Sequence, residues 1–345
     1  MKKTLLALSL LALPAAAQTD WFNAQLEFRS DYDVKTVDGK RSDSGFKGQY
    51  LNLKINGDID NHFSYAYRQR FSKDMRRNGG FLDATDYIFL NYHPNDRWNF
   101  SAGKQFVAIG GYEYDYAPID VYQYSEFCNH IYCYGYGVSV DYNASKNDNI
   151  LLQVSQSAFA DHNRDYYAYN LRWLGKHGFF SSIYSLNMQE YAKGKYMNVV
   201  ALGNQFDFPK GHVLVDFTNK YAKVNDAKFF GDFTLNTELH YQPIPELNLY
   251  ARYCLDRNEA NTADITVRPD TEIHTLGGGI EYFPMKDDQD IRLHLGYYHN
   301  FGKNGNTDDP ALLDNMNYVS VGLIWRANIK KIKERVQAHR QAKAQ

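Results

Sequence analysis

The sequence contains little cysteine and little proline, and it has no excess of charge of either sign. Among 345 residues there are three Cys and nine Pro, and the formal net charge is −2. No CxxC or His/Cys spacing forms a zinc-binding motif, so we expect no metal or other cofactor. The charge balance lacks the basic excess of a nucleic-acid-binding protein. No serine lies in a recognisable nucleophile motif with a histidine. These absences argue against a nucleic-acid partner and against an enzyme.

The chain also lacks long hydrophobic runs. After residue 17 no apolar stretch approaches the roughly 20 residues that a membrane helix requires, and the mean hydropathy is −0.57. Helix counting alone would therefore indicate a soluble secreted protein. A membrane β-barrel has no such run either, because its lipid-facing residues alternate with polar lumen residues. Aromatic residues make up 16% of the chain, including 29 Tyr, and this abundance favours a barrel with aromatic girdles.

Residues 1–17 have the pattern of a secretory signal peptide. Lys2 and Lys3 precede a short apolar stretch from Leu5 to Leu13, and the small residues Ala15–Ala17 offer a cleavage site. The mature chain is expected to begin near Gln18, outside the cytoplasm.

An oxidising compartment permits disulfides in the mature chain. Cys128 and Cys133 lie close together in the segment CNHIYC, which makes them the candidate pair, although the sequence leaves their state undecided. Cys254 has no evident partner and is expected to be a small buried or lumen-facing residue.

Alternation of apolar and polar residues recurs along the whole mature chain and predicts β-strands. In FNAQLEF, the residues Phe22, Ala24, Leu26 and Phe28 fall on one face, and Asn23, Gln25, Glu27 and Arg29 fall on the other. We predict sixteen strands, at 20–32, 46–57, 62–72, 85–92, 97–107, 134–142, 148–158, 165–174, 178–188, 196–206, 211–222, 229–241, 246–256, 271–283, 290–301 and 316–326. Short turns alternate with mostly longer polar loops between them.

This organisation predicts an all-β protein, a transmembrane antiparallel up-and-down β-barrel over residues 18–326. Fourteen or eighteen strands remain alternatives, because 178–188 and 196–206 alternate poorly. A soluble β-sandwich would also alternate, but the apolar faces here end in Tyr, Phe and Trp, which favours the membrane barrel.

The polar faces of the predicted strands would line the lumen. Their basic residues are Arg29, Lys54, Arg68, Arg70, Arg172, Lys220, Arg252 and Arg292. These residues either form an electrostatic path for anions or pair with acidic neighbours on the wall, and for any single residue the second role is favoured. Arg68 and Arg70 are the better candidates for the first role, because they lie two residues apart on one strand face.

The segment from Gly103 to Phe127, GKQFVAIGGYEYDYAPIDVYQYSEF, departs from the alternation. We predict a constriction loop over 108–130 that folds into the lumen, because the segment is too apolar to extend into water. An external loop packed over the barrel mouth is the alternative. The charged residues assigned to the constriction are Lys104, Glu113, Asp115, Asp120 and Glu126. Strict alternation places Lys104 on the outer face, but near the strand end it could snorkel or change face at a bulge.

The motif SAGKQFVAIGG...APIDVY resembles the segment after the fifth strand of Gram-negative trimeric porins, where the chain turns inward as a constriction loop. Within that group the chain most resembles the phosphate-selective porin O and P type of Bacteroides-like bacteria. Gly103, Lys104 and Gln105 match the strand end, and Gly110 to Phe127 match the loop. The resemblance implies a homotrimer in the Gram-negative outer membrane, surrounded by lipid. It also implies passive diffusion of small hydrophilic solutes, with a preference for anions such as phosphate.

Residues 327–345 continue beyond the last predicted strand as a basic tail. The tail contains six Lys/Arg and one Glu, and it is expected to be a short periplasmic helix or a disordered segment. A solvated tail is favoured, while peptidoglycan, anionic headgroups or a periplasmic protein are candidate partners. The alternative to a porin is a barrel subunit of a larger outer-membrane complex, docked through this tail and the external loops.

Overall fold

The computed structural model describes residues 21–73, 80–159, 165–222, 228–259, 266–285, 288–305 and 315–344. The predicted signal peptide 1–17 lies outside the described residues. None of the described helices combines the length and the apolar character needed to cross a membrane.

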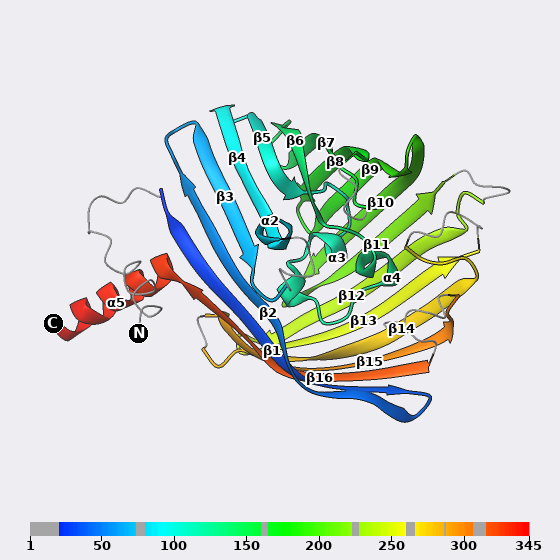
Figure 1. Ribbon diagram of the computed structural model, residues 1–345. Helices are drawn as coiled ribbons and strands as arrows, with labels where there is room; N and C mark the ends of the chain where they lie inside the picture. The colour runs from blue at the N-terminus through cyan, green and yellow to red at the C-terminus, as the bar shows by residue number, and fades with distance from the viewer. Residues whose placement is uncertain are drawn as a thin grey trace.

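Sixteen antiparallel strands form one closed barrel in which each strand pairs with its sequence neighbours and β1 pairs with β16 (Figure 1). The strands are β1 (Asn23–Val37), β2 (Lys40–Asp58), β3 (Phe63–Arg70), β4 (Thr85–Asn95), β5 (Trp98–Phe106), β6 (Tyr134–Asn143), β7 (Asp148–Gln156), β8 (Tyr167–His177), β9 (Phe180–Ala192), β10 (Lys195–Phe208), β11 (Gly211–Tyr221), β12 (Asp232–Ile244), β13 (Leu247–Asn258), β14 (Thr271–Tyr282), β15 (Ile291–Lys303) and β16 (Asn315–Asn328). The predicted fold class and strand number are confirmed.

The predicted alternation sets which face of each strand is covered. In β7, Leu152 and Val154 are 58% and 44% exposed on the outer wall, whereas Gln153 and Ser155 are 4% and 2% exposed inside. Closure of the barrel pairs all the wall strands, which removes the open sheet edges that lipid could not solvate.

β10 explains why its segment alternated poorly in the sequence. Its outer face carries Leu202, but its inner face carries Met197, Val199 and Ala201, all at most 1% exposed. These inner residues belong to a hydrophobic cluster with the loop that follows β5. Both faces of the strand are therefore apolar, because the inner one packs on protein instead of water.

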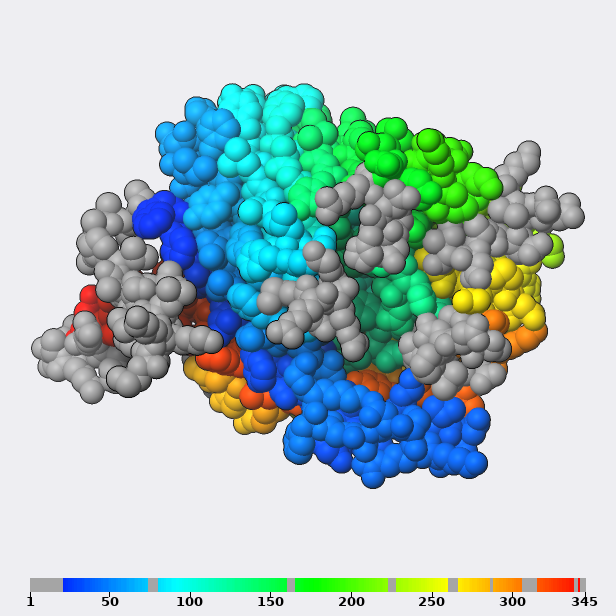
Figure 2. Space-filling view, viewed as in Figure 1, coloured from blue at the N-terminus to red at the C-terminus, as the bar shows by residue number. Residues whose placement is uncertain are grey.

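Residues 33–45, which separate the first two predicted strands, form the end of a β-hairpin. β1 and β2 continue to an Asp38–Gly39 turn, where φ is 49° and 73°, as a two-residue type I′ turn requires. The hairpin projects beyond the rest of the rim (Figures 1 and 2) and carries Phe46, which is 87% exposed. The Asp–Gly pair was the available signal for this turn.

The chain between β5 and β6 crosses the inside of the barrel (Figure 1). It contains α3 (Tyr112–Asp115), the 3-10 helix η1 (Pro118–Asp120) and α4 (Glu126–Asn129). A further short helix, α2 (Phe81–Ala84), precedes β4. We call residues 107–133 the inner loop. Its position is inside the lumen, as predicted, and not over the mouth.

The C-terminal segment forms α5 (Ile329–Ala344), directly after β16. The last strand ends at Asn328, beyond the boundary at residue 326 expected from the sequence, because Ala327 and Asn328 pair with Leu26 and Gln25 of β1. Lys331 of α5 lies 2.6 Å from Asp288 and 2.7 Å from Asp290. The start of the helix is thus tied to the connection between β14 and β15.

Candidate functional site

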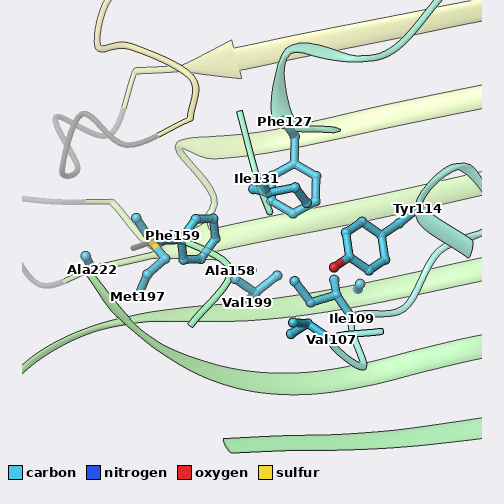
Figure 3. Packing of buried hydrophobic residues seen from close by; sticks show 11 residues of the cluster. Val107, Ile109, Tyr114, Phe127, Ile131, Ala158, Phe159, Met197, Val199 and Ala222 are labelled. Atoms are coloured by element: carbon cyan, nitrogen blue, oxygen red, sulfur yellow. The ribbon is translucent and has the colours of Figure 1, made fainter. Parts of the chain in front are cut away.

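The inner loop packs against one side of the barrel through its apolar residues. Ile109, Tyr114 and Phe127 of the loop meet Met197 and Val199 of β10 in one buried cluster (Figure 3). Burial of large apolar side chains contributes about 1.5–3 kcal/mol each. This contact explains how a segment too apolar for water is accommodated in a polar lumen.

Two glycines bring the loop backbone against the wall. Gly111 has a φ of 96°, and its Cα lies 2.8 Å from the position a Cβ would take on Gly203 of β10. Immediately after Gly111, the amides of Tyr112 and Glu113 donate to the Asp216 carboxylate at 2.9 and 2.8 Å. Asp216 of β11 therefore fixes the point at which the loop enters the lumen.

Glu113 forms a second anchor of the inner loop. Its carboxylate lies 2.5 Å from the guanidinium of Arg252 on β13, which also contacts Glu238 at 2.8 Å. The same carboxylate accepts hydrogen bonds from the backbone amide and the hydroxyl of Ser125. Glu113 thus joins the two arms of the loop to the wall.

The remaining loop carboxylates have different partners. Asp120 lies 2.5 Å from Arg292 and 2.6 Å from Arg326. Asp115 lies 3.7 Å from Arg172. Glu126 contacts His130 within the loop at 2.8 Å, and its backbone amide donates to Asp256 of β13. Glu113, Asp115 and Asp120 therefore lie beside basic wall residues, whereas the contact found for Glu126 is with a loop histidine.

The other basic residues that the sequence assigned to the lumen take part in wall or loop contacts. Arg29 pairs with Asp31 at 2.8 Å and donates to the carbonyls of Ile119 and Val121. Lys54 contacts Glu27 at 2.7 Å. Lys220 is buried and contacts Asp232 at 3.0 Å. Arg29 thus holds the inner loop at a second place on the wall, through the carbonyls that follow Pro118.

Arg68 and Arg70 differ from these pairs because they share one carboxylate with a third cation. Asp86 lies 2.9 Å from Arg68, 3.0 Å from Arg70 and 3.4 Å from Lys73. Three cations against one carboxylate leave a local charge of 3 − 1 = +2. We call these four residues the Asp86 cluster. It is a local excess of positive charge around Arg68 and Arg70, the two residues favoured for an anion path.

Space remains between the inner loop and the strands β1–β3 and β16. It consists of two cavities of 190 and 230 Å³ that share Tyr50, Tyr124 and Asn129. We call them together the tyrosine aperture. Arg70 is the charged residue that lines the first cavity, and Arg29 is the one that lines the second. The loop carboxylates Glu113, Asp115, Asp120 and Glu126 do not line either cavity.

Lys104 does not belong to the constriction. It pairs with Ile88 and Tyr136 on the outer face, and its ammonium lies 3.0 Å from the carbonyl of Leu82 and 5.8 Å from the centre of the Tyr136 ring. Strict alternation placed it correctly, and its assignment to the constriction was wrong. The Leu82 carbonyl in α2 lets the charge remain near the rim.

The structure contains no disulfide between Cys128 and Cys133, and both are free thiols. Each packs separately against the hydrophobic cluster of the inner loop. Desolvation raises the pKa of the Cys133 thiol to about 11, so its reactive thiolate form is scarce at neutral pH. Cys254 is buried, as expected.

Sequence reasoning missed several residues of the site. Asp86 sits where pairing shifts between Arg68 and Gln69, so its inward direction could not be read from alternation. Asp31 lies two residues after Arg29 on β1, and Arg326 lies two residues after the buried Ile324 on β16. Alternation therefore directs both side chains into the lumen, and this was the signal available for them. Among the described residues, no group of three His, Cys, Asp or Glu side chains could hold a metal ion.

Asp216→Ala should loosen the inner loop. The substitution removes two hydrogen bonds from loop amides, each contributing about 0.5–1.5 kcal/mol. We expect larger fluctuations of the open-channel current in planar bilayers. Asp43→Ala is the matched control, because Asp43 is exposed on the hairpin and pairs with Lys47. If the open-channel current of the variant fluctuates no more than that of wild type, Asp216 does not hold the loop.

The fold of the chain is similar to that of several solved outer-membrane proteins. The anion-selective porin from Comamonas acidovorans aligns with 12% identity and a TM-score of 0.60, covering 89% of this chain and 99% of that one. The trimer form of OmpT from Vibrio cholerae aligns with 12% identity and a TM-score of 0.61, covering 89% of this chain and 100% of that one. OmpF of Salmonella typhi in complex with daunomycin aligns with 14% identity and a TM-score of 0.59, covering 89% of this chain and 97% of that one.

At these identities the likeness concerns the fold. A comparison with curated proteins found no match. The family described as phosphate-selective porin O and P matches residues 22–231, which is more than half of the chain. Together with the closed barrel and its inner loop, this match shows that the chain belongs to the phosphate-selective porin O and P family of the Gram-negative outer membrane.

Proposed function

We propose that this porin lets small hydrophilic solutes diffuse through the tyrosine aperture, with a preference for anions. The observation that carries the preference is the pairing of the loop carboxylates. Glu113, Asp115 and Asp120 lie against wall arginines. The charges that line the two cavities are guanidinium groups.

The net charge of the whole chain points the other way, because it is −2. The local arrangement carries more weight, since a charge affects passing ions most strongly within about a Debye length, roughly 8–10 Å at physiological salt. Arg70 borders the aperture and belongs to a cluster with a net charge of +2. Inorganic phosphate suits such a guanidinium, which offers a bidentate fork to an oxyanion.

Several features of the protein in its envelope belong to the same proposal. Cleavage after a signal peptide at 1–17, a homotrimer in outer-membrane lipid and an origin in Bacteroides-like bacteria stay predictions. A periplasmic or envelope partner for the tail 327–345 stays a prediction too, as the alternative to a solvated tail. The family favours a porin over a subunit of a larger complex and over an enzyme.

Liposome swelling tests diffusion through the barrel. Proteoliposomes that contain the folded protein should swell in isotonic arabinose, and more slowly in disaccharides, because the aperture is narrower than the barrel. Liposomes prepared with heat-unfolded protein are the control. If the folded protein causes no swelling even in arabinose, it is not an open porin.

A further inference from the structure

The first cavity of the tyrosine aperture has an unusual lining for an anion path. Five tyrosines border its 190 Å³, and Arg70 is the charged residue among the lining side chains. Selection of inorganic anions by charge alone makes no use of five aromatic side chains. The lining therefore indicates a solute that has both a negative charge and a ring able to pack against aromatic side chains.

Arg70 is directed so that part of its guanidinium remains available. Its Nε donates to Asp86 at 3.0 Å, and its guanidinium carbon lies 5.3 Å from the centre of the Tyr50 ring. Among the described residues, no hydrogen bond involves its two terminal nitrogens. A carboxylate in the cavity would meet these two donors as a bidentate partner.

The tyrosines supply the second half of the site. Tyr50 and Tyr124 border both cavities, and Tyr116 borders the first. In the part of the chain that the structure describes, the hydroxyls of these three residues have no hydrogen-bond partner. Each hydroxyl can both donate and accept. Asn129, which also borders both cavities, adds an amide.

Such a lining matches a ring that carries hydroxyls. The C–H groups of a pyranose pack on an aromatic face, which is the electron-rich side of the ring, while its hydroxyls need donors and acceptors around them. Sites of this kind combine apolar or aromatic walls with a few placed polar groups.

We propose that the tyrosine aperture is a binding site for sugar acids, pyranose rings that carry a carboxylate. The carboxylate binds Arg70, and the ring lies between Tyr50 and Tyr124. This inference rests on the proposed function, because the site lies on the path of the solute. It adds a substrate class to that function, sugar acids, whose recognition depends on the tyrosines as well as on charge.

Blockade of single-channel current in planar bilayers tests the site. Glucuronate added to wild-type channels should interrupt the current in a concentration-dependent way, at concentrations about tenfold or more below those that glucose or acetate requires, and a tenfold ratio corresponds to about 1.4 kcal/mol. Benzoate distinguishes a requirement for ring hydroxyls from a requirement for any ring that carries a carboxylate. It should block less well than glucuronate, because it has no ring hydroxyls. Equal blockade by glucuronate and acetate would overturn the proposal.

Two variants separate the contributions of ring and charge. Arg70→Gln should remove the advantage of glucuronate over glucose. Tyr124→Leu should remove its advantage over acetate. Tyr282→Leu is the control, because Tyr282 is 47% exposed on the outer face, and its blockade should equal that of wild type. Unchanged blockade in both aperture variants would place the sugar acid elsewhere.

The same recordings distinguish failure of this inference from failure of the porin assignment. Channels that conduct in steps but show no preference for glucuronate contradict the sugar-acid site and leave the porin standing. Folded protein that produces no conductance steps contradicts both.

Discussion

Replacement of residues 112–127 by a short Gly–Ser linker is expected to raise the single-channel conductance several-fold. The inner loop fills one side of the lumen with its apolar residues and crosses to Arg29, Arg292 and Arg326 on the other. A barrel of sixteen strands without such a loop encloses a wide aqueous channel. After excision, water would solvate the wall arginines, so no buried charge is left without a partner.

The comparison requires a folded barrel. Folding is checked by the heat-dependent shift of the protein in SDS gels, and the Asp43→Ala variant provides a matched protein with an intact loop. A folded loop-excised barrel with the conductance of wild type would show that the inner loop does not define the pore.

Arg70→Glu should reduce or reverse the anion preference. In wild type, the Asp86 cluster has three cations and one carboxylate, whereas the variant has two cations and two carboxylates, so the local charge changes from +2 to 0. Because Arg70 borders the first cavity, the change acts directly on ions in the aperture. The readout is the reversal potential in a KCl gradient at low ionic strength, where screening is weakest.

Lys303→Glu makes the same charge change away from the aperture. Lys303 pairs with Asp270, and both side chains are mostly exposed, 63% and 74%. Its effect on the reversal potential should be small. Equal effects of the two substitutions would mean that net charge, and not the Asp86 cluster, sets the selectivity.

The barrel could be predicted from the sequence because one periodic signal specifies it. Alternation with a period of two determines which side chains face lipid, as Leu152 and Gln153 illustrate. The aromatic and apolar composition of residues 103–127 indicated a segment that had to pack on something. The lumen was the available surface of sufficient size.

Other features depend on contacts that alternation does not encode. The inner face of β10 is apolar because it packs against the loop, so its pattern weakened the strand prediction instead of revealing the contact. The direction of Asp86 depends on a shift of pairing between β3 and β4. The partners of Glu113 and Asp120 come from strands far away in the sequence, and their choice required the folded loop.

The anion preference of the tyrosine aperture is the central claim, and the reversal potential of the wild-type channel in a KCl gradient tests it most directly. The pairing of the loop carboxylates with wall arginines, together with Arg29 and Arg70 at the cavities, predicts a potential displaced toward the chloride equilibrium value. A potential displaced toward the potassium value would contradict it.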